Sequence, residues 1–250
     1  TIINCFMKEA QKHKIKLLNK MNVKNIEKLE DGRISLFIND DESFIANSVL
    51  IATGSMPKGY QLAKSLGHSI TEIAPSLFTF KIEDIILDNL SGTSFSNAIL
   101  TLKINGEKSF HQKGPLLITH WGLSGPALLK LSAWAAREMM HTNYKAKIIV
   151  NWLGFEQQDD AEKLLVIIKN SNTKTSIGKA YPKELTKRFW LQLLNKCEIS
   201  KDINWSEISK NQLNRILNNL FRCELEVLGK SRFKEEFVEC GGVDLKEINF

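Results

Sequence analysis

The chain has 250 residues, of which 43% are hydrophobic and 25% charged, proportions that are ordinary for a globular protein. No apolar run approaches the roughly 18 residues that a membrane-spanning helix requires, so no membrane partner is expected. The formal net charge of +6 suits a nucleic acid or a phosphate-bearing cofactor, but the basic residues are spread along the chain. A solvated surface is therefore the expected role of the charge, and nucleic acid is not the expected partner.

The start of the chain lacks the basic and apolar pattern of a secretory leader, and its first residue is Thr1 rather than methionine. We therefore expect a fragment of a cytoplasmic protein. None of the four cysteines stands in a C-x-x-C pair or at zinc-finger spacing from a histidine. No metal site is predicted, and the cysteines are expected to be reduced thiols.

The first fifty residues predict a helix followed by a small antiparallel meander. Ile2–Lys12 carries apolar residues at helical spacing. Short β-like runs follow, with turn signals at Asp31-Gly32 and at residues 39–41. These runs cover residues 15–18, 23–29, 33–38 and 43–45.

Residues 48–54 predict an apolar strand that ends in a turn of small residues, Ala52, Thr53 and Gly54. A strand that is almost wholly apolar is typical of a parallel sheet, in which both faces are buried. Small residues at its end allow the backbone to come close to a ligand. Gly67 is typical of the residue that follows the end of a helix.

The middle of the chain is expected to be rich in β-strands. The Asn105-Gly106 pair stands between two apolar runs and predicts a hairpin of residues 98–104 and 108–112. A further strand is predicted over residues 146–152.

Residues 114–137 predict a strand over 115–119, a glycine-rich turn and then a helix. Ser124 is the expected N-cap of this helix, and Pro126 suits its first turn. One face of the helix is expected to be apolar and buried, and consists of Ala127, Leu128, Leu131, Trp134 and Ala135.

One alternative for this stretch is the nucleophile elbow of a serine hydrolase. Its pattern is G-x-S-x-G, and Gly122 and Ser124 fit the first two fixed positions. Pro126 stands where the last glycine belongs, and no recognisable Asp and His partners follow. We therefore set this alternative aside.

The last third of the chain predicts helices over residues 161–169, 183–194 and 210–220. Strands over residues 224–227 and 235–239 are expected after them. Trp190 and Trp205 are interpreted as part of a small helical core rather than as stacking platforms for bases.

Several motifs resemble those of one bacterial family. Residues 117–126, LITHWGLSGP, are similar to its THxGxSGP signature, and residues 238–248, VECGGVDLKEI, to its VTxGGVxLxEI segment. The family comprises NAD(P)/FAD-dependent flavoprotein oxidoreductases and is also known as the aminoacetone oxidase family of FAD-binding enzymes. The resemblance implies an α+β multidomain fold. Part of a two-dinucleotide-binding FAD domain would carry an inserted β-barrel-like domain, which itself contains a small helical subdomain.

This resemblance also implies the domain boundaries. Residues 1–72 would form the partial FAD-binding domain, and residues 241–250 would return to it. Residues 73–154 and 222–240 would form the inserted β-rich domain, with residues 155–221 as its helical subdomain.

The resemblance implies FAD as cofactor and NAD(P)H as its reductant. Its cofactor-binding residues would be Val23, Ala52, Thr53, Gly54, Gly241 and Gly242. His120 lies in the signature turn and is the candidate catalytic residue, with a capping or packing role as the alternative. An organic small molecule would be the hydride acceptor.

Two features depart from the family pattern. No G-x-G-x-x-G is present, and neither is the family's C-terminal flavin-closing segment, so the chain is expected to be a central fragment. A glycine-rich run is also missing between Pro57 and Gly59. The alternative function is therefore an inactive remnant that acts as a binding module, for instance for nucleic acid through its basic surface.

Overall fold

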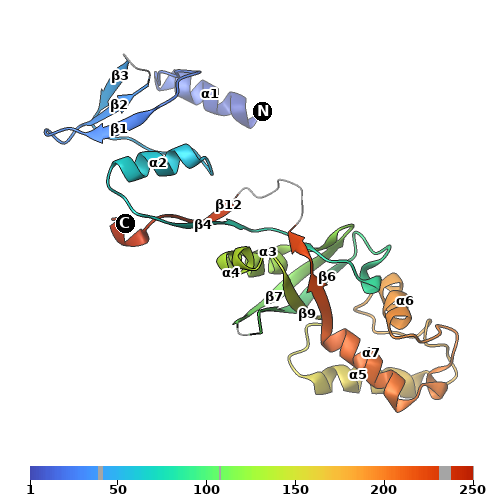
Figure 1. The fold of residues 1–250 in the computed structure, drawn as a ribbon. Coiled ribbons are helices and arrows are strands. Elements are labelled where there is room, and N and C mark those ends of the chain that lie inside the picture. The colour runs from blue at the N-terminus through green and yellow to red at the C-terminus, as the bar shows by residue number, and fades with distance from the viewer. Residues whose placement is uncertain (39–41, 107, 231–237, 250) are drawn as a thin grey trace. The chain divides into compact units, whose positions relative to one another are not determined.

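The computed structural model describes residues 1–38, 42–106, 108–230 and 238–249, and the predicted turn at 39–41 lies outside them. The chain divides into two compact units. The first unit consists of Thr1–Thr71 and Gly242–Phe250, and the second of Glu72–Gly241. Figure 1 follows the chain through both by colour.

The first unit begins with the predicted helix and meander. Helix α1 (Ile2–Lys12) precedes an antiparallel sheet of β1 (Asn25–Lys28), β2 (Ile34–Phe37) and β3 (Ser43–Ala46), in that order. The expected strand over residues 15–18 is wrong. Ile15 and Leu17 are exposed there and pair with no described strand, and a β-strand is stable only when a neighbour takes its backbone hydrogen bonds.

Helix α2 (Pro57–Ser65) packs on the meander. Its Leu62 and Ala63 are buried together with Ile26 of β1, and the Ser65 hydroxyl donates to the Ile26 carbonyl at 3.2 Å. Gly67 follows the helix with φ +93°, as expected for a glycine that ends a helix. By contrast, α1 has no buried residue, although its apolar side chains share one side.

The chain passes between the units in two strands that pair with each other. These are β4 (Ile70–Ser76) and β12 (Val238–Val243). After β12, the chain forms a short 3₁₀ turn, η3 (Leu245–Glu247), in the first unit.

The second unit is built on a seven-stranded antiparallel sheet. Its outermost strands, β10 and β11, are separated along the chain by Leu228 alone, so the two edges of the sheet belong to one extended segment. A sheet whose edges meet in this way is closed into a barrel. In order across the sheet, the strands are β10 (Cys223–Val227), β9 (Ala146–Asn151), β6 (Ser94–Ile104), β7 (Lys108–Thr119), β8 (Gly122–Ser124), β5 (Phe80–Lys81) and β11 (Gly229–Lys230).

The predicted hairpin is the longest pairing in this barrel. Strands β6 and β7 run antiparallel, with Ile104 opposite Lys108. Asn105 and Gly106 have φ angles of 51° and 75°, the positive values that a tight hairpin turn requires. The hairpin prediction is confirmed.

The signature stretch contains one more strand than predicted. After the expected strand at the end of β7, the chain turns at His120 and Trp121 into β8, where Ser124 pairs with Leu117. The N-cap of α3 (Pro126–Trp134) is Gly125, so the prediction for Ser124 is wrong because that residue is held in the sheet. Pro126 occupies the first turn, as predicted.

The predicted apolar face of this helix is also partly wrong. Ala127, Leu128 and Leu131 are buried, but Trp134 is 73% exposed. Trp134 is the last residue of α3 and lies at one edge of the predicted apolar arc, where its side chain meets solvent; α4 (Ala136–His141) starts after Ala135.

Three helices and a 3₁₀ turn follow β9, and they share one hydrophobic core with the barrel. Phe95 and Trp152 of the barrel contact Phe189 of the helices, with ring centroids 4.8–4.9 Å apart. The elements are α5 (Gln158–Ser171), α6 (Lys187–Lys196), η2 (Trp205–Glu207) and α7 (Lys210–Phe221).

Helix α6 starts four residues later than predicted. The hydroxyl of Thr186 accepts a hydrogen bond from the Phe189 amide at 3.3 Å and caps the helix there.

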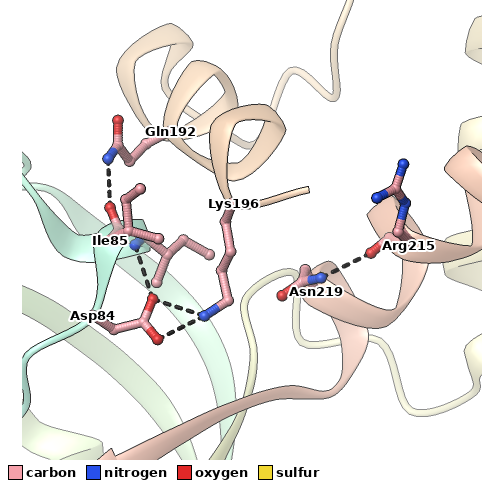
Figure 2. A network of polar contacts seen from close by, with 7 residues as sticks. Asp84, Ile85, Gln192, Lys196, Arg215 and Asn219 are labelled. Atoms are coloured by element: carbon pink, nitrogen blue, oxygen red, sulfur yellow. Dashed lines mark hydrogen bonds and ion pairs between the residues drawn. The ribbon is translucent and has the colours of Figure 1, made fainter. Parts of the chain in front are cut away.

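A half-buried ion pair also connects the barrel with α6 (Figure 2). The Lys196 ammonium lies 2.7 and 2.6 Å from the two carboxylate oxygens of Asp84. Asp84 also accepts a hydrogen bond from the Ile86 amide and caps η1 (Ile85–Leu87), whose Ile85 carbonyl accepts from Gln192. This network orients the start of η1 against α6.

We expect Lys196→Met to lower the free energy of unfolding by about 1–3 kcal/mol, because Asp84 would be left half-buried without its counter-charge. Lys147→Met is the control, since Lys147 pairs with Glu224 on the exposed surface, where solvent screens the pair and its loss should have little effect. Urea unfolding of both variants measures the difference. Equal losses would contradict the role given to the Asp84–Lys196 pair.

Candidate functional site

The predicted cofactor turn lies on the surface of the first unit. Ala52, Thr53 and Gly54 are exposed, and residues 48–53 form no strand, so the prediction of a buried parallel strand is wrong. Leu50, in the middle of the segment, is 89% exposed. The physical reason is that a strand needs a neighbour to take its backbone hydrogen bonds, and among the described residues no strand pairs with this segment.

The start of helix α2 contacts two segments that carry predicted cofactor residues, the turn with Thr53 and the segment with Val23. The side chain of Thr53 lies against Gly59 so closely that a Cβ atom on Gly59 would overlap its hydroxyl. From the same helix, the Lys58 ammonium donates to the Lys24 carbonyl at 2.5 Å, next to the half-buried Val23. Val23 precedes β1 rather than lying within it. The first turn of α2 therefore contacts both the small-residue turn and the segment that holds Val23.

Gly241 and Gly242 have their contacts in β12, against β4, rather than with residues 52–54. Gly241 has φ +105°, and a Cβ atom there would overlap the Glu72 carbonyl, so the close approach of β4 accounts for this glycine. Gly242 has open space beside its Cα, and its carbonyl accepts from the Thr71 hydroxyl at 3.1 Å. Of the two, only Gly242 therefore has room for a Cβ atom, although Gly241 is the more exposed residue.

The end of the chain is held beside these strands by Glu247. Its carboxylate accepts from the Ser69 amide at 3.0 Å and lies 3.0 Å from Nδ1 of His68. Hydrogen bonds from Ser69, and then from His68, hold the pKa of Glu247 below its ordinary value. His68 thus has a positioning role at the surface.

His120 belongs to the second unit, at the turn between β7 and β8. It lies edge-on to Trp121, with ring centroids 4.2 Å apart, and the Trp121 indole donates to Thr79 at 3.1 Å. His120 and Thr119 line a pocket of about 700 Å³, whose other wall is the segment around η1 with Glu83, Asp84 and Asp88. An imidazole at the edge of a pocket can transfer a proton or donate a hydrogen bond to a ligand inside it.

A second pocket, of about 620 Å³, lies among the helices and was not predicted from the sequence. Its lining includes Tyr181 with Lys179 and Lys183 on either side in the chain. The lysines at alternating positions around an aromatic residue were the available signal, but spacing alone does not show that these exposed side chains line a pocket.

All four cysteines are free thiols, as expected. Burial raises the pKa of the Cys197 thiol to about 11 and that of Cys223 to about 12. Both therefore stay protonated at neutral pH and act as core residues. Cys240 is half-buried.

Residues 74–238 match the model of the HI0933-like protein barrel and H2TH domain. This match covers the barrel and its helices, about two thirds of the chain. The chain belongs to the HI0933-like family. No helix of the described ranges combines the length and the apolar character that a bilayer crossing demands.

Three curated relatives match 99% of the chain. Ribosomal RNA dihydrouridine synthase of Haemophilus influenzae is 27% identical, and the enzyme of the same name from Escherichia coli is 23% identical. The 3-dehydro-bile acid delta(4,6)-reductase of Clostridium scindens is 21% identical. The chain spans 60–62% of the length of these relatives.

The names of these relatives are consistent with the predicted flavoprotein oxidoreductase family, and they do not favour the alternative of an inactive binding module.

We expect Glu247→Gln to lower the urea midpoint of the first unit at neutral pH and to have no effect in acid. A depressed carboxyl pKa stabilises the fold above the ordinary value of about 4.3, and this contribution is lost as the pH falls through the lower folded-state value. Urea titrations between neutral and acid pH measure the difference. Glu30→Gln removes an exposed carboxylate of the same unit and is the control. A difference that persists in strong acid would contradict this assignment.

Proposed function

We propose that the protein is a FAD-dependent oxidoreductase that reduces a carbon–carbon double bond conjugated to a carbonyl group. The observation that carries this proposal is the family membership together with the names of the relatives. Dihydrouridine is uridine with hydrogen added across its C5–C6 bond, which is conjugated to the C4 carbonyl. The 3-oxo group of a 3-dehydro-Δ4,6 bile acid is likewise conjugated to its double bonds. One reaction type accounts for both names.

In such a reduction, NAD(P)H supplies the electrons and the reduced flavin supplies hydride to the substrate. Hydride adds to the carbon far from the carbonyl, and the negative charge moves to the carbonyl oxygen. A proton then adds to the carbon next to the carbonyl, so that the product has gained two hydrogen atoms. The protein must hold the substrate, stabilise the oxygen and provide this proton.

The first unit supports a role in holding the cofactor. Ala52, Thr53 and Gly54 form an exposed turn of small side chains beside the start of α2, and a helix start favours phosphate groups. Residue type and exposure fit one edge of a dinucleotide site, with Val23 on the adjacent segment. Gly242, in the same unit, is partly exposed and has open space beside its Cα. For Gly241, contact with β4 is the sufficient explanation.

His120 is the candidate proton donor. Its place at the edge of a pocket with Thr119 supports this role. The free thiols of the chain support the cytoplasm as its compartment.

Ala52→Trp should abolish flavin binding without unfolding the protein. The side chain of Ala52 is exposed, so an indole there has room in this fold but would block a cofactor that lies on the turn. Ser48→Trp adds the same bulk at another exposed position of the segment and should retain flavin. The absorbance near 450 nm of the intact purified protein measures the flavin content, with ~450 nm taken as the usual flavin band. Full flavin content in Ala52→Trp would place the cofactor elsewhere.

The intact protein with NAD(P)H should convert uridine in ribosomal RNA to dihydrouridine, measured by mass spectrometry, or reduce a 3-oxo-Δ4,6 steroid, measured by loss of enone absorbance. His120→Gln should lower kcat about 100-fold or more while flavin reduction by NAD(P)H is retained, because only the proton transfer is affected. Absence of flavin in the intact protein, or no reduction of either acceptor, would overturn the proposed function.

A further inference from the structure

The positive charge of the chain is concentrated in one segment. Residues 169–201 contain eight lysines or arginines and two glutamates, a net charge of +6. This equals the formal net charge of the whole chain, so the remaining residues are neutral on balance. Basic residues occur along the whole sequence, but this part of the helical region has a large net positive charge.

Five of these eight cations are exposed lysines that make no ion pair with any described carboxylate. The other three have structural contacts. Lys196 pairs with Asp84, Lys169 donates to the Ile208 carbonyl, and Arg188 donates to the Asn89 carbonyl. The five exposed lysines are Lys174, Lys179, Lys183, Lys187 and Lys201.

The pocket of about 620 Å³ lies within this segment, and we call it the helical groove. Lys179, Tyr181 and Lys183 line it on one side, and Asn172 and Thr175 contribute polar groups after the end of α5. Glu184 is the one carboxylate among its lining residues. Lys201 lies close by, since its carbonyl accepts from the Gly178 amide at 2.9 Å.

Tyr181 is half-buried and forms the outer end of an aromatic stack. Its ring is stacked on Trp190 at 6.4 Å between centroids, and Trp190 on Trp205 at 6.3 Å. Both tryptophans are fully buried, as predicted for core residues, and their indoles donate to the carbonyls of Ile177 and Ala180. The two buried tryptophans thus hold the Tyr181 ring in place. Little conformational entropy would be lost if a ligand stacked on this ring in the groove.

We propose that the helical groove binds an unpaired segment of RNA, with one base stacked on Tyr181 and the flanking phosphates paired with Lys179 and Lys183. A rigid aromatic ring between exposed cations is the combination that recognises single-stranded nucleic acid. A steroid lacks the negative charges that would pair with five exposed lysines. An acidic peptide lacks the bases that would stack on Tyr181. RNA has both. This inference rests on the proposed function and names its substrate class as RNA.

The test measures binding of a fluorescein-labelled 15-nucleotide oligouridine to the intact protein as a function of salt. The double variant Lys179→Gln/Lys183→Gln should weaken binding about 10-fold or more. The slope of log binding constant against log salt concentration should become less steep by about 1.4, the value for two phosphate contacts on a single strand. Lys163→Gln is the control, because Lys163 lies on α5 beside a separate hollow with Asp159 and Ile167. It should bind as the unmodified protein does.

Tyr181 provides a second and independent test. Tyr181→Leu should weaken binding about 5- to 100-fold with an unchanged salt dependence, whereas Tyr181→Phe should retain it, because stacking requires the ring and not the hydroxyl. Circular dichroism confirms that each variant is folded. If Tyr181→Leu does not fold, the lysine pair still decides the question.

These outcomes are separable from those of the proposed function. Flavin content and reduction of the 3-oxo-Δ4,6 steroid should be unchanged in the lysine variant, so a loss confined to RNA locates the effect in the groove. Unchanged RNA affinity in both groove variants would overturn the inference even if the protein reduces uridine. Equal competition by polyglutamate and by oligouridine would also overturn it, since the groove would then recognise charge alone.

Discussion

The barrel depends on how closely β8 approaches β5. At Gly122, a side chain of any kind would overlap the Phe80 carbonyl oxygen and the Ile82 amide. The absence of a Cβ atom allows the short strand to lie between β7 and β5 and complete the sheet. His120 and Thr119 directly precede this contact, so the same constraint fixes the turn that carries the candidate proton donor.

The helices depend on the barrel for their core. Phe189 of α6 packs on Phe95 and Trp152, and the Asp84–Lys196 pair holds the same helix from the other end. Because the two parts share buried side chains, the helical groove has a rigid support, and its aromatic ring does not have to be ordered when a ligand binds. Within the second unit, the pocket beside His120 and the helical groove are therefore two fixed features of one folded body.

Local sequence signals predicted the parts of the fold that local interactions determine. Asn105-Gly106 forms the hairpin turn because both residues tolerate positive φ, and Pro126 starts its helix because its missing amide hydrogen costs nothing there. Failures arose where tertiary pairing decides. Ser124 has the right side chain for a cap but is held in β8 by Leu117, and residues 48–53 are apolar enough for a strand but have no described neighbour.

The candidate site shows the same division. The small-residue turn at 52–54 and the histidine of the signature could be named from sequence, because their residue types are themselves the signal. The sequence could not show why residue 241 is a glycine, because the reason is the close approach of β4. The helical groove was also hidden, because it joins the end of α5 to a loop ten residues further on.

The pairing of β4 with β12 bears on how such a protein could be rebuilt. Thr71 and Gly242 are hydrogen-bonded neighbours although 170 residues separate them along the chain, so the polypeptide leaves and re-enters the first unit at almost the same point. A short loop could bridge that gap after deletion of everything between. Recombination at these two positions could therefore exchange the whole barrel and its helices for those of another protein while the path of the remaining chain stays intact.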